Sequence, residues 1–279
     1  MTKTVLITGS SSGFGRLTAK LFYEKGWNVI ATMRPPEKEM ELNQLDNVLV
    51  SRLDVKNEES IQKSIAEGFE KFGGIDVLVN NAGYGGYGLF EQVSDEDIRA
   101  MYDTNVFGAM NVMRAILPHM RKQRSGTIIN VTSIAGLMAA PHVSAYSSTK
   151  FALESLSEGM AQELKPLNIH VKTVAPGGFE TNFTTAADDN ADIGDEDLVS
   201  YSQKIVQYIE TVRQNMRQQG GTTANPQDVA DKIFECATTE TPIHNVVGAD
   251  AEMIAQMKNS LPQQEFLDRM AAMLLSQLN

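Results

Sequence analysis

Tyr146 and Lys150 are four residues apart in the run YSSTK over residues 146–150. If this stretch is helical, the spacing puts both side chains on one face, where they reach a common ligand. A free tyrosine has a pKa of about 10 and is a poor base at neutral pH, but a neighbouring ammonium favours the phenolate. The pair could therefore do acid/base chemistry. Alone it is also common on helix surfaces, so the residues that could act with it decide between the two interpretations.

One further polar residue could act with this pair. Ser133 follows a predicted strand over 127–131. A hydroxyl at the carboxyl end of a parallel strand can hydrogen-bond a substrate carbonyl and stabilise charge that grows on its oxygen.

A glycine-rich turn follows the first predicted strand, with glycines at 9, 13 and 15 of the run TGSSSGFG over residues 8–15. Such glycines permit a tight turn, close approach of backbone to a pyrophosphate, and close packing of helix on sheet. The start of the next helix offers free N–H groups to phosphate. The turn is predicted to bind a nucleotide, with a structural turn as the alternative. Its candidate contacts are Gly9, Ser10, Ser12, Gly13, Phe14 and Gly15.

The end of the second predicted strand bears on the choice between NAD and NADP. An acid there would hydrogen-bond the adenosine ribose and repel a 2′-phosphate. The chain instead has Arg34, and no acid lies between the end of this strand and Glu37. A guanidinium suits a 2′-phosphate, so the sequence favours NADP(H) over NAD(H). The alternative is that Arg34 is a solvated loop residue.

Taken together, these motifs resemble those of classical short-chain dehydrogenases/reductases, in the family's order from Thr8 to Thr181. Asn80-Asn81-Ala82-Gly83 ends the fourth predicted strand, and Ser133 precedes Tyr146 by thirteen residues. The resemblance implies further cofactor contacts at Asp54, Val55, Asn81, Ala82, Gly83, Tyr146, Lys150, Pro176, Gly177 and Thr181.

The same resemblance implies an oxidoreductase that moves a hydride between NADP(H) and a carbonyl or secondary alcohol. Tyr146 would be the general acid/base, and Ser133 would position the substrate oxygen. Lys150 would hold the nicotinamide ribose and lower the Tyr146 pKa, and Asn105 would help hold a water that relays protons from the lysine.

The elements that position these residues alternate between short apolar strands and longer helices. Continuous apolar strands between helices predict an α/β fold: a doubly wound, Rossmann-like parallel sheet of about seven strands with helices on both faces. Strands are predicted over 4–7, 28–32, 48–50, 75–79, 127–131, 170–174 and 245–247, and helices over about 14–25, 57–72, 95–121, 145–164, 198–219 and 226–236. Residues 1–279 are predicted to form a single domain.

Residues 182–221 interrupt the alternation: they are polar and acidic, then helical, with no strand expected. They are predicted to be a substrate lid, with a surface excursion as the alternative. Residues 250–279 form a C-terminal extension whose methionines suit core or subunit packing. A moderately apolar substrate could contact side chains that could equally be core: Tyr84, Tyr87, Leu137, Met138, Phe179 and Phe183.

Composition narrows the partners. With 24 basic and 35 acidic side chains, the net charge of −11 disfavours nucleic acid and anionic membrane surfaces. Cys236 is the single cysteine and the four histidines are scattered, so no metal site is predicted. Apolar runs are too short for a signal peptide or a membrane span, so a cytoplasmic protein is expected. The family resemblance implies a homodimer or homotetramer through helices 95–121 and 145–164.

Two other functions are weighed against the oxidoreductase. A non-catalytic NADP(H) sensor or scaffold would need the nucleotide turn but not Tyr146. A lyase or epimerase acting on nucleotide-linked sugars usually needs a larger C-terminal domain than the residues after Gly221 supply.

Overall fold

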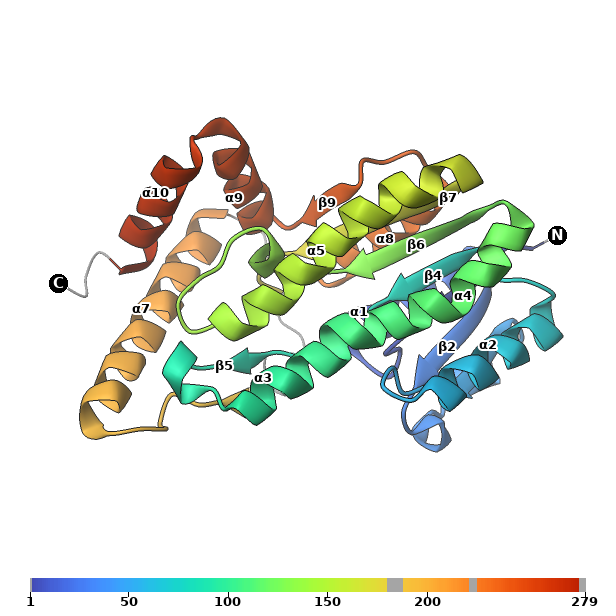
Figure 1. The fold of residues 1–279 in the computed structure, drawn as a ribbon, viewed down its shortest axis with the longest axis horizontal. Coiled ribbons are helices and arrows are strands. Elements are labelled where there is room, and N and C mark those ends of the chain that lie inside the picture. Colours follow the sequence, from blue (N-terminus) through green and yellow to red (C-terminus); the bar gives the residue numbers. More distant parts are fainter. Residues whose placement is uncertain (1, 180–187, 221–224, 276–279) are drawn as a thin grey trace.

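The computed structural model describes residues 2–179, 188–220 and 225–275. Seven parallel strands form one sheet in the order β3-β2-β1-β4-β6-β7-β9 (Figure 1). Their bounds are β1 Thr4–Ile7, β2 Asn28–Met33, β3 Val48–Arg52, β4 Val77–Asn80, β6 Gly126–Val131, β7 Ile169–Pro176 and β9 His244–Val247. The predicted Rossmann-like architecture is confirmed.

Helices cover both faces of the sheet. On one face α1 (Gly13–Glu24) and α8 (Gln227–Thr238) pack on side chains such as Val5 and Ile7. On the other face α2 (Glu58–Phe72), α4 (Ala109–Gln123) and α5 (Ser144–Leu164) pack on Leu6. Successive side chains of a strand point to opposite faces, so strands buried on both sides are apolar throughout.

The helix α2 begins and ends where its sequence predicts. The Asn57 side chain accepts a hydrogen bond from the Ser60 amide at 2.8 Å, which satisfies one free N–H group of the first turn. At the other end Gly73 has φ +78° and donates its amide to the Phe69 carbonyl. A left-handed residue of this kind closes a helix most easily when it is glycine.

The helix predicted over 95–121 is divided into three parts. Ser94 caps α3 (Asp95–Tyr102), a π-helical stretch follows over Asp103–Gly108, and α4 continues from Ala109. Apolar periodicity predicts a helix but not a local change in its winding, so the interruption was missed. Such π stretches occur often at functional sites, and this one carries Asn105.

The expectation of no strand within 182–221 was wrong. Asp188–Asp189 forms a short strand, β8, which pairs in parallel with β5 (Gly86–Tyr87) outside the main sheet. Two acidic residues carry no strand pattern, and their partner lies about a hundred residues earlier in the chain. The helix α7 (Glu196–Gly220) follows.

One buried amide fastens the base of α7 to the segment after β5. The Gln92 side chain donates to the carbonyls of Ala191 and Ile193 at 3.1 and 2.8 Å. Its oxygen accepts from the Leu89 amide at 3.0 Å and from the Ser202 hydroxyl at 2.8 Å.

Two C-terminal helices complete the chain, α9 (Ala249–Ser260) and α10 (Gln263–Leu275). Figure 1 shows α7, α9 and α10 together, beyond the carboxyl ends of the strands. Met138, Ile254, Phe266 and Met270 form a buried apolar cluster there, with Met257 and Met273 against it. The methionines of the C-terminal extension thus take part in packing, except that Met253 is exposed.

Candidate active site

The turn after β1 is fastened to the end of β4 by two side chains. The Thr8 hydroxyl accepts hydrogen bonds from the amides of Asn81 and Ala82, both at 3.0 Å. In return the Asn81 side chain donates to the carbonyls of Thr8 and Gly9 at 3.0 and 3.1 Å. The glycine turn and the Asn81–Gly83 segment are therefore one rigid unit.

The glycines of this turn meet two separate needs. Gly9 and Gly13 have φ of +70° and +54°, a region that side-chain-bearing residues adopt only under strain. A Cβ on Gly15 would lie 2.4 Å from the Gly9 carbonyl oxygen, so the helix could not approach the turn. Ser12 precedes α1 without a capping hydrogen bond from its side chain to a described residue. The start of α1 therefore keeps N–H groups for an anion.

The other predicted cofactor contacts lie around this turn. Ser10 is buried, and its hydroxyl donates to the Ile7 carbonyl at 3.0 Å, so its contact with a phosphate stays a prediction. Arg34 is exposed just past β2. Asp54 is half-buried and Val55 is buried, both just past β3.

An ion pair that sequence reasoning missed fixes the loop that follows Arg34. Glu39 is buried and binds Arg16 of α1 through both carboxylate oxygens. Its carboxylate also accepts from the amides of Glu41 and Leu42, both at 2.9 Å. The Arg16 hydrogen bond, helped by these amides, lowers the Glu39 pKa to about 2. The pair is 23 residues apart, so no local pattern signals it.

Ser133, Tyr146 and Lys150 come together at the carboxyl end of β6. Ser133 starts a 3₁₀ turn, and its hydroxyl accepts from the Ala135 amide at 3.1 Å and shares a hydrogen bond with Tyr146. The Lys150 ammonium donates to the Val131 carbonyl at 3.1 Å and lies 5.8 Å from the centre of the Tyr146 ring.

Burial dominates the electrostatics of this group. Tyr146 as a whole is half-buried, but loss of solvation around its hydroxyl raises its pKa well above the ordinary value. The hydrogen bond with Ser133 has the opposite, smaller effect on this pKa. The Tyr146 pKa is thus raised rather than lowered as expected, because loss of solvation of the phenolate is the largest effect on it. Burial also lowers the Lys150 pKa to about 8.

Asn105 ties two segments of the site together. Its side chain donates to the Tyr84 carbonyl at 2.8 Å and to the Thr149 hydroxyl at 3.2 Å, and it accepts from the Tyr84 amide at 3.0 Å. A Cβ on Gly83 would lie 3.0 Å from the Asn105 oxygen and 3.7 Å from the Lys150 nitrogen. The role of Asn105 in holding a water stays a prediction.

Two further tyrosines, Tyr84 and Tyr87, lie close to Tyr146. Tyr84 packs with Tyr146 in a small apolar cluster. Tyr87 raises the Tyr146 pKa and stacks on His142, with ring centres 6.1 Å apart. His142 is buried and has φ +67°, a strained conformation for a residue with a side chain.

The remaining candidate substrate and cofactor contacts lie elsewhere near the carboxyl ends of the strands. Met138 and Phe179 are buried in apolar clusters, which is the core alternative that the sequence left open, and the Leu137 carbonyl accepts from Lys258 at 2.6 Å. Pro176 ends β7, and the Gly177 amide donates to the Val247 carbonyl. Two candidates lie outside the described residues: Thr181 and Phe183.

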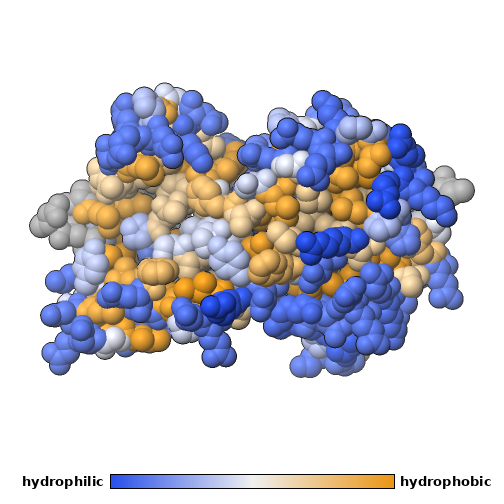
Figure 2. Space-filling view, viewed as in Figure 1, coloured by the Kyte–Doolittle hydropathy of each residue, from blue (hydrophilic) through white to orange (hydrophobic). Residues whose placement is uncertain are grey.

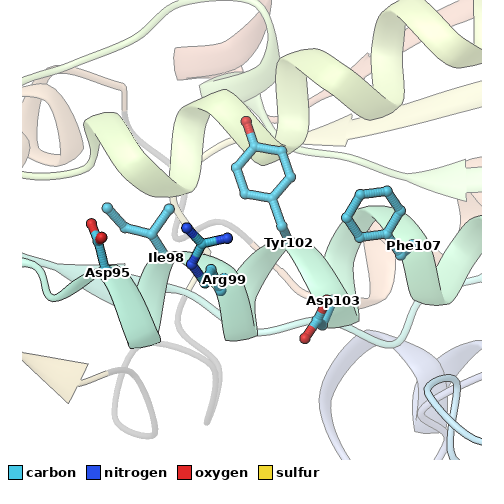
Figure 3. Close-up of a pocket in the computed structure, with 6 residues that line it drawn as sticks. All are labelled: Asp95, Ile98, Arg99, Tyr102, Asp103 and Phe107. Carbon is cyan, nitrogen blue, oxygen red and sulfur yellow. The ribbon is translucent and has the colours of Figure 1, made fainter.

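A groove lined by α3 and the π-helical stretch shares no residue with this site. Its lining side chains project from α3 and the π-helical stretch (Figure 3): Asp95, Ile98, Arg99, Tyr102, Asp103 and Phe107. Tyr102 points toward α5, where its hydroxyl donates to Ser148 at 3.1 Å.

Within residues 2–179, 188–220 and 225–275, no group of three or more His, Cys, Asp and Glu side chains is arranged to hold a metal ion. Among the helices of the described chain, none combines the length and apolar character that a membrane crossing requires.

Comparison with known proteins decides the family. Residues 3–192 match the family model described as short chain dehydrogenase. The chain belongs to the short-chain dehydrogenase family. Membership places it among oxidoreductases that act on CH–OH or carbonyl groups.

Two curated relatives are similar to this short-chain dehydrogenase over different shares of its length. It is 42% identical to a 3-ketodihydrosphingosine reductase of Bacteroides thetaiotaomicron over 64% of this chain and 65% of that protein, a little under two thirds of its length. It is 37% identical to the uncharacterized oxidoreductase YusZ of Bacillus subtilis over 85% of each chain.

Solved structures of similar proteins share the fold and carry both kinds of nicotinamide cofactor. A short-chain dehydrogenase from Streptomyces avermitilis is 33% identical, with a TM-score of 0.79 over 96% of this chain and 98% of that one. ElxO with NADP bound is 30% identical, with a TM-score of 0.74 over 91% and 100%. A 3-ketoacyl-(acyl-carrier-protein) reductase from Brucella melitensis complexed with NADH is 26% identical, with a TM-score of 0.72 over 88% and 96%.

Proposed function

We propose that this short-chain dehydrogenase is an NADP(H)-dependent oxidoreductase of carbonyls or secondary alcohols, with Tyr146 as its general acid/base. The observation that carries the proposal is the meeting of Ser133, Tyr146 and Lys150 beside the Gly83 segment, which is joined to the glycine turn. The turn proposed to bind the nucleotide and the proposed acid/base group thus lie at the carboxyl ends of the strands. Open parallel sheets usually bind their ligands at this end.

The residues present fit a dinucleotide phosphate. The close approach at Gly15 and the start of α1 suit a pyrophosphate, and Lys150 would hold the nicotinamide ribose. NADP(H) is favoured over NAD(H) because exposed Arg34 follows β2, while the first acid after it, Glu37, pairs with Arg52 at 2.8 Å. When bound, the cofactor supplies or accepts the hydride.

The protein side chains manage the proton and the substrate oxygen. In reduction, Tyr146 donates its phenolic proton to the oxygen of the carbonyl as that oxygen gains negative charge. Its raised pKa keeps this proton on the phenol at neutral pH until the substrate oxygen gains charge. Ser133 hydrogen-bonds the same oxygen and orients it. In oxidation the Tyr146 phenolate accepts the alcohol proton.

We propose a substrate with an apolar portion, contacted by Tyr84 and Tyr87 beside Tyr146. Similarity to a 3-ketodihydrosphingosine reductase supports a ketone. The substrate lid over 182–221, the C-terminal extension over 250–279 and the single domain over 1–279 remain parts of the proposal. The helix α10 packs on α7, and the Tyr208 hydroxyl of α7 donates a hydrogen bond to the Met273 carbonyl of α10. This packing supports the proposal that the lid and the C-terminal extension cover the substrate together.

We also propose a homo-oligomer through α4 and α5. Apolar side chains gather over the middle of the face that carries these helices (Figure 2), and Phe107 and Phe151 are 50% and 39% exposed. Light scattering coupled to gel filtration should give a dimer or tetramer. A monomer at micromolar concentration would contradict this part of the proposal.

The testing experiment follows NADPH oxidation and NADP⁺ reduction over a panel of ketones, aldehydes and alcohols that includes long-chain 3-keto compounds. Tyr146→Phe should keep NADPH affinity within about twofold and lose at least about 10²-fold in turnover, the lower range for a general acid/base. Wild-type turnover in this variant would refute the role of Tyr146. Tight NADPH binding without turnover on any substrate would favour a sensor or scaffold.

A further inference from the structure

A buried carboxyl group lies directly behind the candidate catalytic residues. Glu154 is 5% exposed and lies on α5 one turn after Lys150. One of its oxygens accepts a hydrogen bond from the hydroxyl of Thr132, the residue before Ser133. Glu154 is therefore linked to the Ser133 backbone by a side chain and to Lys150 by the turn of the helix.

The other carboxylate oxygen is held from the opposite side by an imidazole. His244, the first residue of β9, lies with Nδ1 2.7 Å from Glu154, and its Nε2 is 3.0 Å from Glu158. The Thr173 hydroxyl lies 3.3 Å from the same Nδ1 atom. Two carboxylates that face both ring nitrogens favour the doubly protonated ring, and the His244 pKa is raised accordingly.

Tight packing transmits the position of Glu154 to the site. A Cβ on Gly136, in the turn that Ser133 starts, would lie 3.1 Å from the Glu154 Cγ atom and 3.0 Å from the Lys150 carbonyl oxygen. The Ser133 turn therefore rests directly on the part of α5 that carries Lys150 and Glu154. A shift of Glu154 would move either the turn or the helix.

We propose that Glu154 is a positioning residue for the reaction, which orients Ser133 through Thr132, supports the charged form of Lys150, and is itself held by His244. The inference rests on the proposed role of Tyr146 and Lys150. Glu154 touches neither substrate nor cofactor in this scheme, so its influence is indirect. A purely structural glutamate would fill the same volume without changing the ionisation of the site.

The charge of Glu154 matters because Lys150 is almost completely buried. Burial lowers the Lys150 pKa, and Glu154 is the charged group that raises it again. The charged and titratable groups facing Glu154 are Lys150 and Glu158 on its own helix and His244 on β9. The Thr132 hydroxyl, just after β6, donates to Glu154, and the Thr173 hydroxyl within β7 lies beside His244. Loss of the carboxylate charge should let Lys150 lose its proton at lower pH.

The test compares Glu154→Gln with Glu163→Gln, the same change at an exposed position of α5. Turnover and KM for NADPH-dependent reduction are measured between pH 6 and 10, with NADPH affinity and thermal stability alongside. For Glu154→Gln, we expect the alkaline fall of kcat to move about one pH unit lower, with KM changed less than about twofold. Glu163→Gln should leave the profile in place.

A second pair of variants tests the link through Thr132. Thr132→Ser keeps the hydroxyl and should keep most of the turnover, whereas Thr132→Val removes it and should lower kcat about tenfold or more, because Ser133 loses its orientation. A pH profile and kcat unchanged in folded Glu154→Gln protein would overturn the inference. That outcome differs from failure of the proposed function, which would appear as unchanged turnover in Tyr146→Phe.

Discussion

Replacing Gly15 by alanine should damage both the cofactor cradle and the stability of the fold. The added Cβ would lie 2.4 Å from the Gly9 carbonyl oxygen and 2.5 Å from the Asn81 side-chain nitrogen. Both neighbours would have to move by several tenths of an ångström or more. The Asn81 nitrogen also makes the two hydrogen bonds that hold the turn, so the strain falls on the linkage between β1 and β4.

The expected loss of unfolding free energy follows from these contacts. Overpacking of a rigid site costs about 1–3 kcal/mol, and weakening one or two hydrogen bonds adds about 1 kcal/mol each. A total of about 3 kcal/mol corresponds to a drop of roughly 6–10 °C in Tm for a chain of this size. A displaced turn should also raise the Kd for NADPH by about tenfold or more, since each tenfold is about 1.4 kcal/mol.

The assay is thermal unfolding and fluorescence titration with NADPH, with Gly159→Ala as the matched control. Outside the neighbouring backbone of α5, no described atom lies within 4 Å of a Cβ added at Gly159. Gly159 is exposed, so this change should raise the free energy of unfolding by about 0.5–1 kcal/mol. Wild-type Tm and NADPH affinity in Gly15→Ala would refute the argument from close approach.

Three further changes test other contacts. Arg34→Asp should raise the NADPH Kd by about ten- to a hundredfold and leave that of NADH less affected, because a carboxylate repels a 2′-phosphate; equal effects on both cofactors would contradict this. Glu39→Gln should lower the free energy of unfolding by up to about 3 kcal/mol at pH 7, because the Glu39 pKa of about 2 in the folded chain lies below its ordinary value of 4.5. That stabilisation is complete above pH 4.5 and is lost as the pH falls toward 2, so urea unfolding should show the gap from wild type narrowing with acid; a constant gap would count against the ion pair. Lys172→Met should lower the free energy of unfolding by about 2 kcal/mol in the same assay, because Lys172 is buried and donates to the Cys236 and Thr239 carbonyls at the end of α8. An unchanged urea midpoint would show that water replaces both hydrogen bonds.

Much of the architecture could be predicted because its signals are local. Each buried strand is a continuous apolar run, and α2 has an asparagine before it and a glycine after it. The π-helical stretch and β8 were missed for a physical reason. Winding within a helix depends on contacts such as Gly108 against Val55, and β8 is defined by its partner β5 rather than by its own residues.

The candidate site shows the same division. The i,i+4 spacing of Tyr146 and Lys150 predicts their proximity, and the structure brings Ser133 to them. The direction in which the Tyr146 pKa shifts could not be predicted, because the shift depends on how completely the folded chain excludes water from the phenol. Glu154 and His244 are 90 residues apart and carry no motif, so only the fold reveals their contact.

The mutual hydrogen bonds of Thr8 and Asn81 form within the polypeptide itself. The turn after β1 is therefore organised during folding, and the arriving dinucleotide does not have to order it. Binding should then resemble a lock-and-key encounter in which the bound conformation is already the populated one. Differences in affinity between related nucleotides should consequently arise from how fast each one leaves rather than from how fast it arrives.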